Sequence, residues 1–295
     1  MRVKEIAAYS GHAAPIYHLE VENGILYSAA GDSVLAAWDT EKNEAHAFSI
    51  KAESGLFTSL VQPELVLIGN SKGNIHIINR AEKREIKNLN THANGVFFIL
   101  KVSEFLITGG GRGVVNFLDS RSFKLLRSLK LSSKKMRSAV ACRNGKSVYL
   151  GCGEGTVRRI ELDYFNEIST RNISKKSINS LALHPRKPVL VTSSADGFVR
   201  VLDQESLAVI VSFPAHNDSV YKLSFSPDGK YLLTVSKDKT FKIWNADSLN
   251  LEFKGDRSSV DAHKNSINSS VWFSNEEFFT AGDDKSIKRW KISWS

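Results

Sequence analysis

Residues 216–245 read HNDSVYKLSFSPDGKYLLTVSKDKTFKIWN, and this stretch decides the fold. Polar and apolar residues alternate over 219–225, as in a strand with one buried face. Residues 226–229 (Ser-Pro-Asp-Gly) indicate a turn, because proline presets φ and glycine permits a positive φ. Three further strands are expected at 230–235, 240–244 and 248–253. The stretch and its continuation therefore predict four antiparallel strands joined by short links.

The phrase D-x-x-x-x-x-W, which closes this stretch, recurs along the chain in weaker forms. The residues that close it are Trp38, Ile78, Leu118, Ile160, Leu202, Trp244 and Trp290. Their separations are 40, 40, 42, 42, 42 and 46 residues, a mean period of 42. Four-stranded repeats of about 40–45 residues are typical of a β-propeller. The chain is therefore predicted to be an all-β, seven-bladed β-propeller that forms a single domain over residues 1–295.

The motifs that open and close these repeats resemble those of the WD-repeat family. Gly11-His12 opens the first repeat and Trp38-Asp39 closes it. In that family a His, a Ser or Thr, an Asp and the Trp form a buried hydrogen-bonded tetrad within a blade. The resemblance implies three complete tetrads: His12, Ser28, Asp32 and Trp38; His216, Thr234, Asp238 and Trp244; His263, Thr280, Asp284 and Trp290. Their His-to-Asp spacings of 20, 22 and 21 residues agree with one another.

The other repeats lack part or all of the tetrad. The third keeps His92 and Thr108, and the fifth keeps Thr192 and Asp196. The residues at their remaining positions are Arg112 and Leu118 in the third repeat and Ser174 and Leu202 in the fifth. The second and fourth repeats keep none of it, so we expect them to rely on apolar packing alone.

A Ser, a His and an Asp together also suggest a nucleophilic triad. A catalytic triad occurs once in a chain, whereas this set recurs with the repeat and faces a Trp each time. The structural interpretation is therefore favoured, and we predict no catalytic residues and no enzymatic activity.

The two ends of the chain are expected to close the ring. Only five residues follow Trp290, so the seventh repeat has no fourth strand of its own. Residues 2–9 precede His12 at the place where 207–211 precede His216, and 207–211 reads as an outer strand. The N-terminal segment is therefore predicted to complete the last blade, which removes an open sheet edge.

Charge and cysteine content narrow the class of protein further. The net charge is +9, and residues 121–200 hold 17 Lys and Arg against 5 Asp and Glu. This basic arc is expected to prefer acidic partners, although a solvated lysine-rich surface is the simpler interpretation. The only cysteines are Cys142 and Cys152, and register places Cys142 opposite Ser147, so no disulfide is expected. With no apolar leader at the start and no run of 18 apolar residues, we expect a cytoplasmic protein without a membrane span.

Two other kinds of motif carry no chemistry. The glycine-rich segments 109–113 and 151–155 precede strands, whereas a phosphate-binding loop precedes a helix. Four histidines outside the tetrad positions, His18, His46, His76 and His184, share no metal-ligand spacing. We therefore predict no metal site, no cofactor and no small-molecule substrate.

Family resemblance places partner binding on the top rim, around the entrance of the central channel. The residues five positions after each His position are Tyr17, Phe57, Phe97, Arg137, Asn179, Tyr221 and Asn268. Four of these seven are aromatic, although aromatic residues make up only 9% of the chain. Exposed aromatic residues are common interaction anchors. The alternative for Phe57 and Phe97 is a place in the core of an irregular blade.

Basic residues of the same rim are expected to add a cationic side. They are Lys134, Lys135 and Arg137 in the fourth repeat, Lys175 and Lys176 in the fifth, and Lys237 in the sixth. The chain is therefore predicted to be an interaction scaffold for a protein or peptide that carries an apolar anchor and an acidic or phosphorylated stretch. The alternative is nucleic acid, with Lys134, Lys135, Arg137, Arg158 and Arg159 following the phosphates and rim aromatics stacking on bases.

Overall fold

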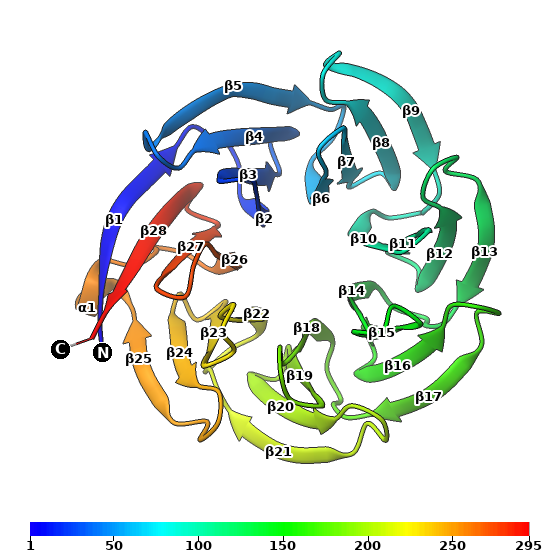
Figure 1. Cartoon of the computed structure of the whole chain (residues 1–295). Coiled ribbons are helices and arrows are strands. Elements are labelled where there is room, and N and C mark those ends of the chain that lie inside the picture. Colours follow the sequence, from blue (N-terminus) through cyan, green and yellow to red (C-terminus); the bar gives the residue numbers. More distant parts are fainter. Residues whose placement is uncertain (295) are drawn as a thin grey trace.

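The computed structural model describes residues 1–294 as seven four-stranded antiparallel sheets arranged in a ring around a central channel (Figure 1). In six sheets the strand that comes first in the chain lies nearest the channel and the fourth lies on the outside. In the seventh sheet β26 is innermost and the N-terminal strand β1 is outermost. This arrangement confirms the predicted seven-bladed β-propeller. We number the blades 1 to 7 in chain order.

Each of the first six blades is continuous in sequence. Blade 1 holds β2 (Ile16–Glu22), β3 (Ile25–Ala30), β4 (Val34–Asp39) and β5 (Glu44–Lys51). Blade 2 holds β6 (Leu56–Val61), β7 (Leu65–Asn70), β8 (Asn74–Asn79) and β9 (Arg84–Asn90). Blade 3 holds β10 (Val96–Val102), β11 (Phe105–Gly110), β12 (Val114–Asp119) and β13 (Leu125–Lys130).

The second half of the ring follows the same plan. Blade 4 holds β14 (Met136–Ala141), β15 (Ser147–Cys152), β16 (Thr156–Glu161) and β17 (Glu167–Asn172). Blade 5 holds β18 (Ile178–Leu183), β19 (Val189–Ser194), β20 (Phe198–Asp203) and β21 (Val209–Pro214). Blade 6 holds β22 (Val220–Phe225), β23 (Tyr231–Ser236), β24 (Phe241–Asn245) and β25 (Leu251–Gly255). Blade 7 holds β26 (Ile267–Trp272), β27 (Glu277–Gly282), β28 (Ser286–Ser293) and the N-terminal β1 (Arg2–Ser10).

Blade 7 is therefore built from both ends of the chain. Strand β1 pairs antiparallel with β28, with Val3 opposite Ile292 and Ser10 opposite Ser286. Figure 1 shows the two termini side by side at the edge of the ring. The predicted closure by the N-terminal segment is confirmed.

The hydrophobic core lies in seven seams, each between two neighbouring blades. Between blades 6 and 7, for example, Phe241 contacts Trp290 and Phe278, with ring centroids 4.9 and 5.4 Å apart. These apolar seams occur because the alternating strands bury residues on both faces of the second and third strands of a blade. Each blade thus depends on two neighbours for its burial.

The long separation of 46 residues between Trp244 and Trp290 is explained by an insertion before blade 7. It contains a single turn of helix, α1 (Arg257–Val260), whose N-cap Asp256 accepts backbone hydrogen bonds from Ser258 and Ser259. Both cysteines are buried and free, with Cys152 opposite Met136 in the sheet. Among residues 1–294, no helix is long and apolar enough to cross a membrane.

Candidate binding site at the channel mouth

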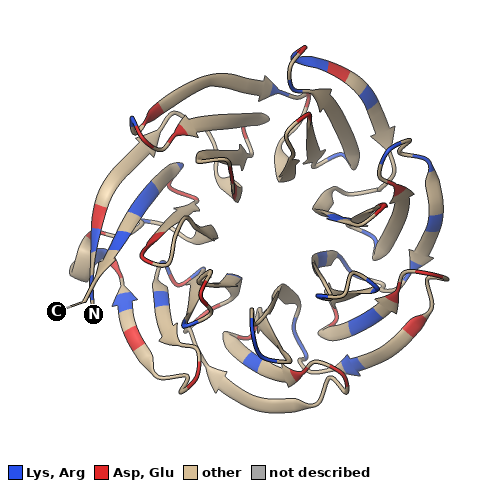
Figure 2. Ribbon diagram, viewed as in Figure 1, with Lys and Arg blue, Asp and Glu red and all other residues tan. Residues whose placement is uncertain are grey.

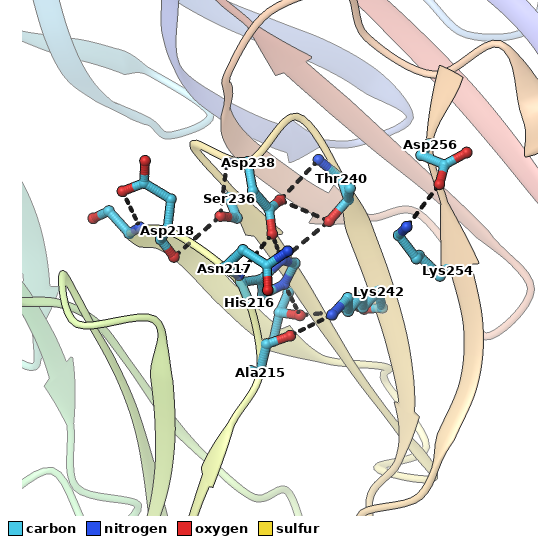
Figure 3. Close-up of polar contacts among 12 residues, drawn as sticks. Ala215, His216, Asn217, Asp218, Ser236, Asp238, Thr240, Lys242, Lys254 and Asp256 are labelled. Atoms are coloured by element: carbon cyan, nitrogen blue, oxygen red, sulfur yellow. Dashed lines mark hydrogen bonds and ion pairs between the residues drawn. The ribbon is translucent and has the colours of Figure 1, made fainter. Parts of the chain in front are cut away.

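The top face of the ring carries the His and Asp positions of the repeats, and three blades hold all four side chains of a tetrad together. In blade 6, His216 Nδ1 lies 3.0 Å from Asp238 (Figure 3). The Nε2 atom of His216 lies 2.8 Å from Thr234 Oγ1. The indole Nε1 of Trp244 donates to the same Thr234 hydroxyl at 2.9 Å. Since an indole can only donate, the hydroxyl donates onward to Nε2, and Nδ1–H donates to the carboxylate.

Blades 1 and 7 have the same geometry. His12 lies 2.9 Å from Asp32 and 2.7 Å from Ser28, to which Trp38 donates at 2.8 Å. The corresponding distances in blade 7 are 2.9 Å for His263 and Asp284, 2.8 Å for His263 and Thr280, and 2.8 Å for Trp290 and Thr280. In all three blades the Asp also accepts a backbone N–H from the residue that follows the His. The tetrad therefore ties the link that enters each blade to the turn between its second and third strands.

These contacts control the charge on the carboxylates. Burial alone would raise the pKa of Asp238, but hydrogen bonds from His216, Thr240 and the Asn217 backbone hold that pKa well below its ordinary value. Burial lowers the pKa of His216, so its imidazole is neutral at pH 7. In the blade 6 tetrad every polar side chain is therefore engaged in a hydrogen bond within the blade.

Blades 3 and 5 keep parts of this arrangement. His92 Nε2 lies 2.8 Å from Thr108, but with Arg112 and Leu118 in the other two positions its Nδ1 has no hydrogen-bond partner in the described part of the chain. In blade 5, Ser174 donates to Asp196 at 2.8 Å, and Arg200 pairs with the same carboxylate at 2.7 Å. Burial would raise the pKa of Asp196, but the Arg200 and Ser194 hydrogen bonds lower it to about 2.

The expectation that blades 2 and 4 rely on apolar packing alone is wrong. In blade 2 the buried His76 lies between two carboxylates, 2.9 Å from Glu53 and 2.6 Å from Glu85. In blade 4, Ser132 donates to Glu154, and Arg158 pairs with Glu167 at 2.5 Å.

A signal for these networks is present in the sequence, two residues before each closing position. That position holds Ala36, His76, Asn116, Arg158, Arg200, Lys242 and Lys288. Six of these seven side chains are polar, and in blades 6 and 7 they reach back to carbonyls of the preceding link: Lys242 to Ala215 and Lys288 to Asp261. The family tetrad does not include this position, so a search for tetrad residues does not reveal these networks.

The first strand of every blade contains a register shift at one residue. The shifts fall at Tyr17, Phe57, Phe97, Arg137, Asn179, Tyr221 and Asn268, so that each of these residues is skipped in the pairing with the second strand. A β-bulge of this kind turns a side chain away from the direction that the pleat would give it. The seven residues chosen from the repeat spacing are thus the seven bulged residues.

All seven of these side chains line one cavity of about 530 Å³ at the entrance of the channel. On one side of it, three aromatic rings form a row: Tyr17 contacts Phe57 edge-on at 5.4 Å between centroids, and Phe57 stacks on Phe97 at 5.2 Å. Phe57 and Phe97 are half-buried there, and Tyr17 is 37% exposed. The alternative that Phe57 and Phe97 are core residues of their blades is therefore wrong.

Two cations of blade 4 cap the end of this row. Lys135 Nζ lies 5.0 Å from the centre of the Phe97 ring, and the Arg137 guanidinium lies 5.7 Å from it. Burial, followed by the charge of Arg137, lowers the pKa of Lys135, and burial also lowers the pKa of Arg137. Lys135 is exposed and Arg137 is half-buried, so both cations can bind an anion that approaches the aromatic row from outside.

The remaining predicted rim residues lie outside this cavity. Lys134, Lys175 and Lys176 are exposed on the links that enter blades 4 and 5, and Lys237 is exposed and pairs with Asp218 at 3.1 Å. Figure 2 shows the basic residues of blade 4 on its inner strand β14 and on β16.

Among the lining residues that the sequence analysis did not place on the rim, three are ionisable: His18, Lys222 and Asp283. His18 and Lys222 directly follow the bulged residues Tyr17 and Tyr221, and burial lowers the pKa of both, to about 3 for His18. Asp283 precedes Asp284 of the blade 7 tetrad. Their positions next to motif residues were the available signal.

No three His, Cys, Asp or Glu side chains within residues 1–294 converge as the ligands of a metal ion would. The cavity at the channel mouth is lined by aromatic rings, cations, amides and the carboxylate of Asp283.

Comparison with known families identifies the repeats. The family model described as WD domain, G-beta repeat, matches residues 166–203, 207–245 and 256–291. Each match starts near the outer strand of one blade and runs through the third strand of the next, so the three cover blades 5, 6 and 7. No curated protein matches the chain. The chain is therefore a seven-bladed β-propeller with WD repeats detected in blades 5, 6 and 7.

Proposed function

We propose that this propeller is a non-enzymatic interaction scaffold that holds a protein or peptide at the channel mouth. WD-repeat propellers generally serve as scaffolds for protein interactions, which supports the class of function. The observation that carries the choice of surface is the convergence of seven bulged side chains on one cavity. Bulges re-aim side chains at functional sites, and here one occurs at the same place in every blade.

The chemistry of the cavity supports one kind of partner. The row of Tyr17, Phe57 and Phe97 offers aromatic surface for an apolar anchor residue. Lys135 and Arg137 make no ion pair with any described residue, so both can accept an anion from outside. We therefore propose a peptide segment with an apolar side chain next to a carboxylate or phosphate.

Substitutions in the cavity test this proposal against a matched change elsewhere. A partner is first recovered with the intact protein, and its affinity is then measured for Tyr17→Ala and for Arg137→Gln. Each substitution should weaken binding by about tenfold, the value of a desolvated anchor or a charged hydrogen bond. Tyr164→Ala is the control, because Tyr164 is 80% exposed on the link between β16 and β17, away from the cavity. Wild-type affinity in both cavity variants would refute the proposal.

Nucleic acid is the alternative partner, favoured by the exposed Lys134, Lys175 and Lys176. Two of the arginines expected to follow phosphates are already engaged, however. Arg158 pairs with Glu167 at 2.5 Å, and the buried Arg159 pairs with Glu205 at 2.5 Å. Phosphate contacts would make the affinity fall steeply with salt. A shallow salt dependence favours the peptide, and a steep one that Lys175→Glu reduces would favour nucleic acid.

A further inference from the structure

We propose that the channel mouth is dipolar and that its second pole, at Asp283, binds a Lys or Arg side chain of the same peptide. This inference rests on the proposed function and adds a cation subsite to it. The ligand would carry an acidic group toward blade 4, an apolar anchor on the aromatic row, and a basic group toward blade 7.

Asp283 has the properties of a carboxylate held ready for a cation. It lines the cavity, and its backbone N–H donates to the Ser266 carbonyl at 2.9 Å, which fixes the turn between β27 and β28. Asn268, itself tied to the Ile16 carbonyl at 3.0 Å, donates to Asp283 Oδ1 at 2.7 Å. No basic side chain of residues 1–294 forms an ion pair with Asp283. Its neighbour Asp284 is committed to His263, so the two adjacent carboxylates have different tasks.

Two phenol rings line the cavity together with this carboxylate. Tyr17 of blade 1 and Tyr221 of blade 6 belong to the blades on either side of blade 7, and both line the same cavity. Burial, and after it the charge of Asp283, raises the pKa of Tyr17. Burial is also the largest cause of the raised pKa of Tyr221, and Asp283 adds to it. A carboxylate between two tyrosine rings suits an ammonium or guanidinium group, which gains ion-pair and cation–π contacts together.

The two poles lie on opposite sides of the ring. Lys135 and Arg137 belong to blade 4, and in a ring of seven, blade 4 is three blades from blade 7 in one direction and four in the other. Figure 1 shows β14 and β26 facing each other across the channel. Tyr221 lies within electrostatic reach of both poles, since Arg137 and Asp283 act on its pKa in opposite senses. Asp283 and the pair of Lys135 and Arg137 therefore stand on two walls of one cavity, while the third lining cation, Lys222, interacts with the charge of Glu20.

This arrangement favours a peptide according to the order of acidic and basic residues along it. The cavity of about 530 Å³ has room for only a few side chains, so both charges must come from one short segment. A segment with two acidic groups would bring one of them against Asp283, and a segment with two basic groups would meet Lys135 and Arg137. Like-charge contacts of this kind exclude wrong partners as effectively as the correct contacts attract the right one.

Selection from a phage-displayed library of random 12-residue peptides tests the inference. The intact wild-type protein should select peptides with a basic, an apolar and an acidic residue at fixed spacing. Asp283→Asn keeps an oxygen for the Asn268 hydrogen bond, so this variant should fold normally and lose only the preference for the basic residue. A synthetic copy of a selected peptide should bind Asp283→Asn about tenfold more weakly, as expected for one charged contact. Asp163→Asn, an exposed carboxylate outside the cavity, is the matched control.

Two results separate this inference from the proposed function. If the selected peptides depend on Tyr17 and Arg137 but bind Asp283→Asn as well as wild type, the cation subsite is refuted and the proposed function stands. If no selected peptide depends on Tyr17 or Arg137, the proposed function fails, and the inference fails with it.

Discussion

At the scale of single residues, the hydroxyl at the centre of a tetrad does more than fill space. Thr234 accepts from Trp244 and donates to His216, whereas Thr192 of blade 5 has only a long contact of 3.5 Å to the Arg200 carbonyl. Both threonines are fully buried in their second strands. A comparison of Thr234 with Thr192 therefore separates the contribution of the hydrogen bonds to stability from the contribution of burial.

Replacing each threonine by valine, which keeps the shape, measures that difference. Thr234→Val leaves the Trp244 indole and His216 Nε2 without partners, so it should lower the free energy of unfolding by about 2–4 kcal/mol. Thr192→Val loses only the long contact and should cost less than about 1 kcal/mol. Urea unfolding of both variants checks this. Equal costs would show that the tetrad bonds contribute nothing beyond packing.

A second prediction at this scale concerns pH. Burial lowers the pKa of His92 to about 4 from its ordinary value of 6.5. The unfolded chain therefore binds this proton first, so stability is complete above pH 6.5 and decreases as the pH falls toward 4. Between pH 7 and pH 5 the loss from this residue should be about 2 kcal/mol.

Substitution of His92 isolates this contribution. In His92→Gln the amide can still reach Thr108, and urea unfolding at pH 7 and at pH 5 should show a decrease in stability that is smaller by that amount. An identical decrease in the wild type and the variant would mean that His92 is already protonated in the folded state, or that its imidazole is not buried.

At the scale of strands, the sequence predicted positions better than it predicted contacts. The repeat register located all seven bulged residues, because a bulge at a constant place in each blade preserves the spacing from the His position. The strands expected in residues 219–253 lie within three residues of those observed. For the polar networks of blades 2 and 4, the sequence carries a signal only at His76 and Arg158, two residues before the closing positions. Their partners could not be predicted, since Glu53, Glu85 and Glu167 come from links and outer strands with no fixed register to the motif.

The N-terminal strand gives the third prediction. Deleting residues 1–9 removes β1 and leaves β28 with an open edge next to Trp290. The shortened protein should self-associate or lose its cooperative melt, because an unpaired edge invites strand addition. Light scattering and thermal melting measure this.

A synthetic peptide of residues 1–10 serves as the control for that deletion. When it is added in excess it should pair with β28 and restore the monomer and the melt. A deletion variant that stays monomeric with an unchanged melt would contradict closure by β1.

At the scale of the whole molecule, the ring brings equivalent positions of the repeats together on one surface, which has an aromatic side and a cationic side. Blades 1 to 3 supply the aromatic row, and Lys135 of the entry link and Arg137 of β14 in blade 4 cap it. The sequence predicted an aromatic and a cationic side on this rim. It could not show that Lys135 and Arg137 cap Phe97 directly, or that Asp283 lines the same cavity, because these residues come together only when the ring closes. The basic excess of residues 121–200 is also partly consumed by ion pairs, such as that of Arg159 with Glu205.

The central claim, that partners bind at the channel mouth, is tested most directly by the kinetics of one complex. Reversing the charges of Lys134, Lys135 and Arg137 to Glu should mainly slow association and reduce its salt dependence, since rim charges steer the encounter. Replacing Tyr17 and Tyr221 by Ala should mainly speed dissociation, because anchors set the residence time. Surface plasmon resonance with the partner recovered by the intact protein measures both rates. Slower association in the first variant and faster dissociation in the second are the predicted results, and wild-type rates in both would place the binding surface elsewhere on the propeller.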